Sequence, residues 1–231
     1  KADLGDAIDA ADVITGGTGT SDVFQISGDA TGDDVTSTLA IGITAFETWE
    51  ITDNRAYSIT TSETNVADGK TLTINANKLT TNVLTFDGSD ENDGKFIINA
   101  TGNKNHVITL GNGDDTYSSA STGADAVVAT AGNNTISTGD GADKITGGTG
   151  SDNITSGAGA DIFKFETGNL TSTDTIDGGS GTDELRLITD GSIVIDDDFT
   201  NITNVEKLSS LNTDDSTADV SLTATLGAKA A

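Results

Sequence analysis

The chain has 231 residues, with 11 Lys or Arg against 37 Asp or Glu and a formal net charge of −26. Such an excess of carboxylates repels nucleic acid and anionic membranes, so neither is expected as a partner. The chain has no Cys, which excludes disulfides and thiolate chemistry, and no stretch approaches the roughly 18 apolar residues of a membrane span. It also begins without Met, so we expect it to be a piece of a longer protein.

Residues 1–50 are expected to form a glycine-rich turn and linking strands. The block Gly16-Gly-Thr-Gly-Thr-Ser-Asp22 precedes the apolar Phe24, and Asp22 is a candidate metal ligand. A second block, Ile43-Thr-Ala-Phe-Glu47-Thr-Trp49, follows it.

Both of these blocks recur near the end of the chain, over 178–185 and 202–208. Asp12 precedes the first block and Asp174 precedes its counterpart, 162 residues later. Glu47 in the second block and Glu206 in its counterpart are 159 residues apart. The spacing predicts one long repeat, with residues 191–231 as C-terminal strands that start a second repeat. The alternative is that both blocks are generic glycine-rich phrases of similar composition.

Residues 51–110 are predicted to form a β-solenoid segment with degenerate repeats. Short apolar runs at 71–76, 82–86, 95–100 and 106–110 are separated by Asn, Asp, Gly and Lys turns. No run has the apolar period of an amphipathic helix. Regular short strands with such turns indicate an all-β, parallel β-solenoid fold.

Residues 111–190 contain nine-residue repeats, three of which follow one another without a gap over 138–146, 147–155 and 156–164. Each has small residues at its first two positions, Gly at the fourth, Asp at the sixth and a large apolar residue at the eighth. Six residues form a tight turn and three form a minimal strand whose central side chain points inward. Two units then make one turn of the coil, so turns 18 residues apart stack.

Stacking predicts two edges of aligned ligands and two inward apolar columns. Asp125, Asp143 and Asp161 share one edge, and Asp115, Asn134 and Asp152 share the other. The predicted inward columns are Val127, Ile145 and Phe163 on one side and Tyr117, Ile136 and Ile154 on the other.

Carboxylates and glycine-turn carbonyls offer only oxygen, which suits several calcium ions and disfavours zinc. The expected metal ligands are Asp22, Asp115, Asp125, Asp143, Asp152, Asp161 and Asp183, with Gly113, Gly139, Gly141, Gly148, Gly150, Gly157, Gly159, Gly179 and Gly181 in the turns. Asn134 and His106 are not expected to bind calcium, because an amide is a weaker ligand and an imidazole is unsuited to this ion. One inward side chain per nine residues offsets little ordering entropy, so we expect residues 110–185 to fold only with calcium.

At these nonapeptides the chain resembles the RTX family of calcium-binding repeat proteins, also called hemolysin-type. The resemblance implies a calcium-bound β-roll and a bacterial protein that is exported by type I secretion to the extracellular side or the cell surface. The long repeat and the Cys-free composition resemble those of RTX-type surface-layer (S-layer) proteins. That resemblance implies self-association into a lattice or tandem array, with cell-surface polysaccharide as a second partner.

Other functions are less consistent with the residues. An extender or ligand-binding module of a large RTX adhesin is the main alternative, ahead of an ice-binding module or an accessory module of a secreted enzyme. No catalytic residue is expected, because the chain has a single His and lacks both a His-Glu-x-x-His motif and a Gly-x-Ser-x-Gly elbow. Adjacent carboxylates such as Asp114 and Asp115 face opposite sides of a strand, which disfavours glycosidase chemistry.

Overall fold

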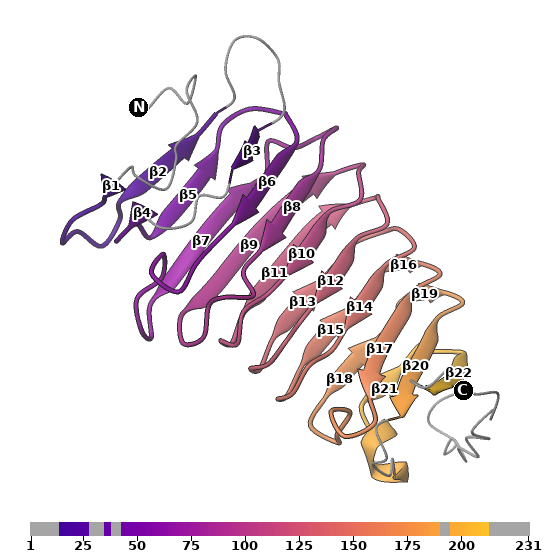
Figure 1. The fold of residues 1–231 in the computed structure, drawn as a ribbon. Coiled ribbons are helices and arrows are strands. Elements are labelled where there is room, and N and C mark those ends of the chain that lie inside the picture. The colour runs from indigo at the N-terminus through magenta and orange to yellow at the C-terminus, as the bar shows by residue number, and fades with distance from the viewer. Residues whose placement is uncertain (1–13, 28–34, 38–42, 190–194, 213–231) are drawn as a thin grey trace.

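The computed structural model describes residues 14–27, 35–37, 43–189 and 195–212. These residues form a parallel β-solenoid in which the chain alternates between two stacked sheets of nine strands each (Figure 1). The predicted all-β solenoid is therefore confirmed.

Sheet 1 consists, in spatial order, of β2 (Val23–Ile26), β5 (Thr48–Ile51), β7 (Thr71–Ala76), β9 (Lys95–Gly102), β11 (Thr116–Ser121), β13 (Thr135–Ser137), β15 (Asn153–Thr155), β18 (Thr175–Asp177) and β21 (Ile202–Thr203). Sheet 2 consists of β3 (Val35–Ser37), β6 (Tyr57–Thr60), β8 (Leu84–Asp87), β10 (Val107–Thr109), β12 (Ala126–Val128), β14 (Lys144–Thr146), β17 (Ile162–Glu166), β20 (Glu184–Thr189) and β22 (Lys207–Asn212). Two short pairs, β1 (Ile14–Thr15) with β4 (Ile43–Thr44) and β16 (Ala158–Gly159) with β19 (Ser180–Gly181), and the 3-10 helix η1 (Asp196–Phe199) complete the described elements.

The core lies between the sheets, and one column of buried side chains runs along each sheet, joined by further buried side chains on the longer strands. In sheet 1 the residues in register are Phe24, Trp49, Ile74, Ile98, Tyr117, Ile136, Ile154, Ile176 and Ile202. In sheet 2 they are Ile59, Phe86, Ile108, Val127, Ile145, Phe163 and Leu185. All are buried. Both inward columns predicted from the nonapeptides are confirmed.

The nonapeptide strands are as short as their pattern predicts. β12, β13, β14 and β15 each have three residues, and only the central side chain faces the core. Sheet pairing continues without interruption through the expected boundary near residue 110, since β9 pairs with β11 and β8 with β10. Asp12 and most of the expected second repeat over 191–231 lie outside the described residues.

The turns form two edges, which we call edge 1 and edge 2. Edge 1 carries the turns that lead into the strands of sheet 1, and edge 2 carries those that lead into sheet 2. The described residues include no helix that is long and apolar enough to cross a membrane.

Candidate metal centre

Edge 2 carries a continuous ladder of acidic side chains, each of which accepts a hydrogen bond from the backbone of the turn before it. The bonds run from His106 N–H to Asp125 (2.8 Å), Asp125 N–H to Asp143 (2.7 Å), Asp143 N–H to Asp161 (2.8 Å), Asp161 N–H to Asp183 (2.8 Å) and Asp183 N–H to Glu206 (2.8 Å). One carboxylate oxygen thus joins each turn to the next. The ladder brings together four of the predicted site residues.

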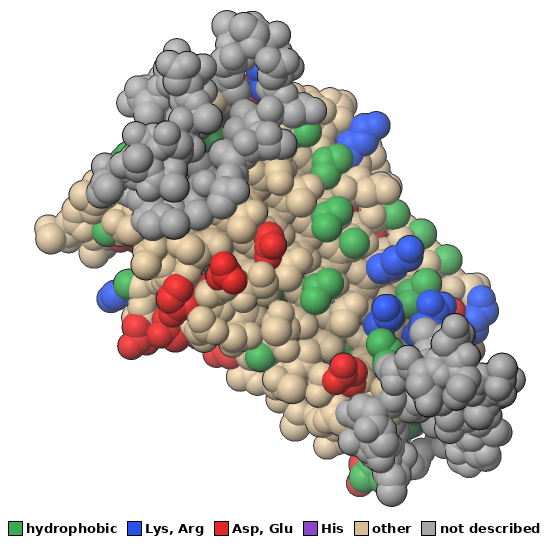
Figure 2. Space-filling model, viewed as in Figure 1, with side chains coloured by type: hydrophobic (Ala, Val, Ile, Leu, Met, Phe, Trp, Pro, Cys, Tyr) green, Lys and Arg blue, Asp and Glu red, His purple; other side chains and the backbone are tan. Residues whose placement is uncertain are grey.

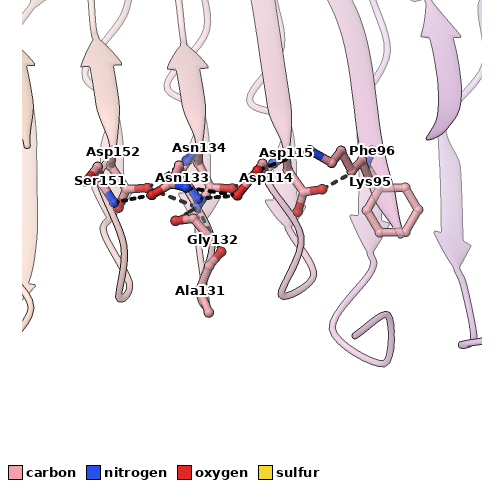
Figure 3. Close-up of polar contacts among 10 residues, drawn as sticks. All are labelled: Lys95, Phe96, Asp114, Asp115, Ala131, Gly132, Asn133, Asn134, Ser151 and Asp152. Carbon is pink, nitrogen blue, oxygen red and sulfur yellow. Dashed lines mark hydrogen bonds and ion pairs between the residues drawn. The ribbon is translucent and has the colours of Figure 1, made fainter. Parts of the chain in front are cut away.

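Edge 1 carries a second ladder of the same kind (Figure 3). Its bonds run from Phe96 N–H to Asp115 (2.7 Å), Asp115 N–H to Asn134 (3.0 Å), Asn134 N–H to Asp152 (3.0 Å) and Asp152 N–H to Asp174 (2.8 Å). The predicted residues Asp115 and Asp152 therefore lie on one edge, as their spacing indicates.

The second oxygen of several ladder carboxylates has no hydrogen-bond partner. Oδ2 of Asp143, Asp152, Asp161 and Asp183 is buried and unpaired. A buried carboxylate oxygen without a partner loses its hydration with no compensation, which is costly. A cation bound beside these oxygens would supply the missing partner.

In Asp115 and Asp125, as in Asp174, whose Oδ2 accepts the Thr171 N–H at 2.8 Å, the protein satisfies both carboxylate oxygens. Oδ2 of Asp115 accepts the Gly111 N–H at 3.1 Å, and Oδ2 of Asp125 accepts the Tyr117 hydroxyl at 2.9 Å. The structure therefore gives these two predicted ligands a built-in partner that Asp143 and Asp161 lack.

Asn134 and His106 occupy ladder positions without offering an obvious cation ligand. The Asn134 amide nitrogen donates to the carbonyls of Ala131 and Gly132 and to Asp152 Oδ1, at 3.0–3.2 Å. His106 Nδ1 accepts the Leu84 N–H at 3.0 Å, while Nε2 lies 3.1 Å from the Thr101 carbonyl oxygen. Each side chain still accepts a backbone N–H from the turn before it, which is the hydrogen bond that we call a rung of the ladder.

The predicted glycines line the same turns, where stacked backbones come too close for a side chain. A Cβ on Gly157, whose φ is 88°, would lie 2.0 Å from the Gly139 carbonyl oxygen. The remaining predicted glycines meet a backbone carbonyl one turn away in the same manner: Gly113, Gly139, Gly141, Gly148, Gly150, Gly159, Gly179 and Gly181. This close approach presents backbone carbonyls beside the ladder carboxylates.

Burial makes the ladder carboxylates hard to ionise without a cation. Desolvation, together with the charges of the neighbouring Asp125 and Asp161, raises the pKa of Asp143 to about 6, against the backbone hydrogen bond from Asp125. Desolvation likewise raises the pKa of Asp115 to about 6. The pKa values of Asp125, Asp152 and Asp183 are raised as well, with burial as the largest cause.

Asp22 lies away from both nonapeptide ladders, in a structure that we call the N-terminal clasp (Gly16, Asp22, Ala45 and Glu47). The Asp22 N–H donates to Glu47 Oε2 at 2.7 Å, and Asp22 Oδ2 is buried and unpaired. Ala45 has a φ of 57°, and a Cβ on Gly16 would lie 2.1 Å from its carbonyl oxygen.

The same arrangement recurs at the other end as the C-terminal clasp (Gly178, Asp183, Asn204 and Glu206). The Asp183 N–H donates to Glu206 Oε2 at 2.8 Å, Asn204 has a φ of 53°, and a Cβ on Gly178 would lie 2.0 Å from the Asn204 carbonyl oxygen. Ala45 and Asn204 are the two non-glycine residues with positive φ in the described part of the chain. The sequence repeat thus corresponds to a repeated local structure.

Sequence reasoning missed three carboxylates of these sites, namely Asp174, Glu47 and Glu206. Asp174 ends the edge 1 ladder, but it follows Asp152 by 22 residues rather than 18, because a longer loop lies between them. The two Glu residues were visible as matching members of the long repeat, and that match was the available signal for their role.

The donor set fits a hard divalent cation. Unpaired buried oxygens of Asp143, Asp152, Asp161 and Asp183, with carbonyls of the adjacent glycine turns, would hold calcium, which takes 6–8 oxygen ligands in irregular geometry. The bound ion would neutralise the stacked carboxylates and satisfy their second oxygens.

The fold and these turns define the class of protein as a parallel β-solenoid with an oxygen-lined, β-roll-like edge. The model of the RTX calcium-binding nonapeptide repeat (4 copies) matches residues 119–154, 137–169 and 171–186, so the chain contains RTX repeats of the hemolysin type. These matches cover less than half of the chain. Each ladder begins at a residue before the matched segments, Phe96 on edge 1 and His106 on edge 2. Comparisons with curated proteins and with solved structures gave no match. RTX repeats are typical of secreted bacterial proteins.

Proposed function

We propose that this chain is a calcium-dependent structural segment of a bacterial surface layer, in which calcium completes the fold and permits assembly. The observation that carries the proposal is the column of Asp143, Asp161 and Asp183, whose Oδ2 atoms are buried and unpaired. A fold that accumulates such oxygens at successive turns depends on bound cations for much of its stability.

The repeated clasp supports a modular role. Its two copies share an Asp–Glu backbone bond, a positive-φ residue and a glycine packed against that residue's carbonyl. A long repeat of this kind suits a protein that extends as a tandem array of solenoid modules.

The charge distribution supports self-association. Lys144, Lys164, Arg186 and Lys207 are four of the 11 basic residues, and they lie on neighbouring strands of sheet 2, β14, β17, β20 and β22. Figure 2 shows basic side chains gathered at this end of the molecule, and acidic ones near the loops at the opposite end. With a net charge of −26, a second copy of the chain offers a complementary surface to the basic patch. Cell-surface polysaccharide remains a second proposed partner.

An extender or ligand-binding module of a large RTX adhesin is the second candidate, and the elongated stack of strands in Figure 1 favours it. Electron microscopy of the calcium-loaded parent protein separates the two. Two-dimensional sheets that dissolve in chelator are expected for a surface layer. Isolated rods at all protein concentrations would contradict the surface-layer proposal and support the adhesin.

Calcium dependence itself is tested by circular dichroism of the full chain with calcium and after its removal. We expect the β-sheet signal to fall when calcium is removed and to return when it is restored. A spectrum that does not change with calcium would refute calcium-coupled folding.

A further inference from the structure

Three carboxylates meet at edge 1 outside the nonapeptide turns and before the residues matched as RTX repeats. Glu63 lies in the loop that leads into β7, and Glu91 and Asp93 lie in the loop that leads into β9. These loops stack in the same way as the turns beyond them, because Gly69 N–H donates to the Asp93 carbonyl at 3.2 Å and Asn112 N–H to the Glu91 carbonyl at 2.9 Å. Figure 2 shows acidic side chains gathered near this edge.

The three side chains are close enough to share one ion. One carboxylate oxygen from each lies within 4.8 Å of the other two. Oxygens that bind the same calcium at roughly 2.3–2.6 Å are at most about 5 Å apart, so the cluster has a suitable span. Glu63 and Asp93 are exposed, which leaves an entry path from solvent, whereas Glu91 is fully buried.

Exposed acidic clusters are common without a metal, and Glu91 is what distinguishes this one. Its Oε1 accepts the N–H groups of Gly94 (2.8 Å) and Asp93 (3.3 Å). Its Oε2 is buried and has no hydrogen-bond partner, like Oδ2 of the ladder aspartates. A wholly buried carboxylate with one unpaired oxygen beside two further carboxylates requires either a proton or a cation.

The surroundings add negative charge and no compensating ion pair. Burial, and then Glu63 and Asp93, raise the pKa of Glu91 against two backbone hydrogen bonds. Among the described residues, the ion pairs are Arg55 with Asp53, Lys95 with Asp114 and Arg186 with Glu184, so none involves the three carboxylates.

We infer that Glu63, Glu91 and Asp93 bind a calcium ion at a site separate from the nonapeptide turns. The donors are all oxygen and come from irregular loops, which suits calcium better than the strict octahedron of magnesium. The ion joins two long loops that lie outside the nine-residue repeats. Glu63 comes from the loop before β7 and Glu91 from the loop before β9, and these two strands are neighbours in sheet 1. It would extend the calcium-stabilised edge towards the N-terminal half of the solenoid.

The test counts calcium ions bound to the full chain by equilibrium dialysis against CaCl2. Glu63→Gln and Glu91→Gln are compared with the wild type and with Glu166→Gln, which removes an exposed carboxylate on β17. We expect each of the first two variants to lose one ion per chain, or to bind it at least tenfold more weakly. Unchanged number and affinity in both variants would overturn the proposal.

Glu63 is exposed, so its substitution leaves the core intact and keeps the test valid even if Glu91→Gln perturbs folding. Thermal unfolding gives a second readout. Both variants should be stabilised less by calcium than the wild type, and calcium-free Glu91→Gln should be at least as stable as the wild type, because a buried charge is gone. Equal destabilisation of Glu91→Gln with and without calcium would assign it a purely structural role.

The result is separable from the function proposed for the nonapeptides. In a chain that also carries Asp143→Asn and Asp161→Asn, Glu63→Gln should still remove one ion. If the nonapeptide substitutions change no ion count while Glu63→Gln does, the RTX turns lose their proposed role and this site keeps its own. If Glu63→Gln removes no ion in either background, this site is refuted.

Discussion

Replacing Asp143 by Asn should affect the protein in opposite ways with and without calcium. The amide oxygen can still accept the Asp125 N–H, which holds the rung, while the unpaired Oδ2 is replaced by an NH2 group. Asn134 shows that such a rung forms in this fold, since its amide nitrogen donates to the carbonyls of Ala131 and Gly132.

The magnitudes follow from the ionisation of Asp143 and from linkage. Burial raises its pKa from 3.8 to about 6, and one pKa unit corresponds to about 1.4 kcal/mol, so removing this charge should stabilise the calcium-free chain by up to about 3 kcal/mol at pH 7.5. An ion present at 100 times its dissociation constant stabilises the folded state by about 2.7 kcal/mol. The gain in stability on adding calcium should therefore be smaller in the variant by about that amount or more.

Circular dichroism at pH 7.5 reports both quantities. The β-sheet signal that remains after calcium is removed reports the first, and the calcium concentration that restores the signal reports the second. Asp140→Asn is the matched control, because Asp140 lies in the same turn and is exposed. A variant that is destabilised without calcium and keeps the full gain on adding calcium would refute the reasoning, since Asp143 would then be a purely structural rung.

Three further predictions concern pH, the turns and the core. Because the folded-state pKa of Asp143 lies above its unfolded value, its contribution to calcium-free stability is present below about pH 4 and is lost as pH rises through about 6. The calcium-free chain should therefore keep more β-sheet signal in circular dichroism at pH 5 than at pH 7.5, and the opposite order would contradict the shift. Gly157→Ala should lower the free energy of unfolding by several kcal/mol, and clearly more than Gly17→Ala. Gly17 also has a positive φ (99°), but no atom lies within 4 Å of its new Cβ. Equal losses of stability in the two variants would show that stacking is not the constraint. Ile145→Ala should cost about 2–5 kcal/mol in the calcium-loaded chain, against little for the exposed Val128→Ala, and similar small losses for both would place Ile145 outside the core.

The nonapeptide segment was predictable because one short period fixes both the strand and the turn. Once two units make a turn, the register of Ile145 with Val127 and Phe163 follows from the 18-residue spacing, and so does the alignment of Asp143 with Asp161. Glycine at fixed positions then follows from the close approach of stacked turns.

The sites outside this period could not be found in the same way. Asp174 is displaced by a longer loop, and the cluster of Glu63, Glu91 and Asp93 has no repeat to align its members. Only the fold shows that Glu91 is buried with an unpaired oxygen, because burial in a solenoid depends on which loops stack. The satisfied oxygens of Asp125 likewise depend on Tyr117, which comes from the opposite sheet.

The two clasps have a geometric consequence for an extended array. Asp22 leads into β2 of sheet 1, whereas Asp183 leads into β20 of sheet 2, so an odd number of half-turns separates the two copies. A tandem array with this period would rotate each module by half a revolution relative to the one before it, apart from the twist of the sheets. Equivalent surfaces would then face opposite directions in alternate modules, and such an array could bind further copies of itself on both of its sides.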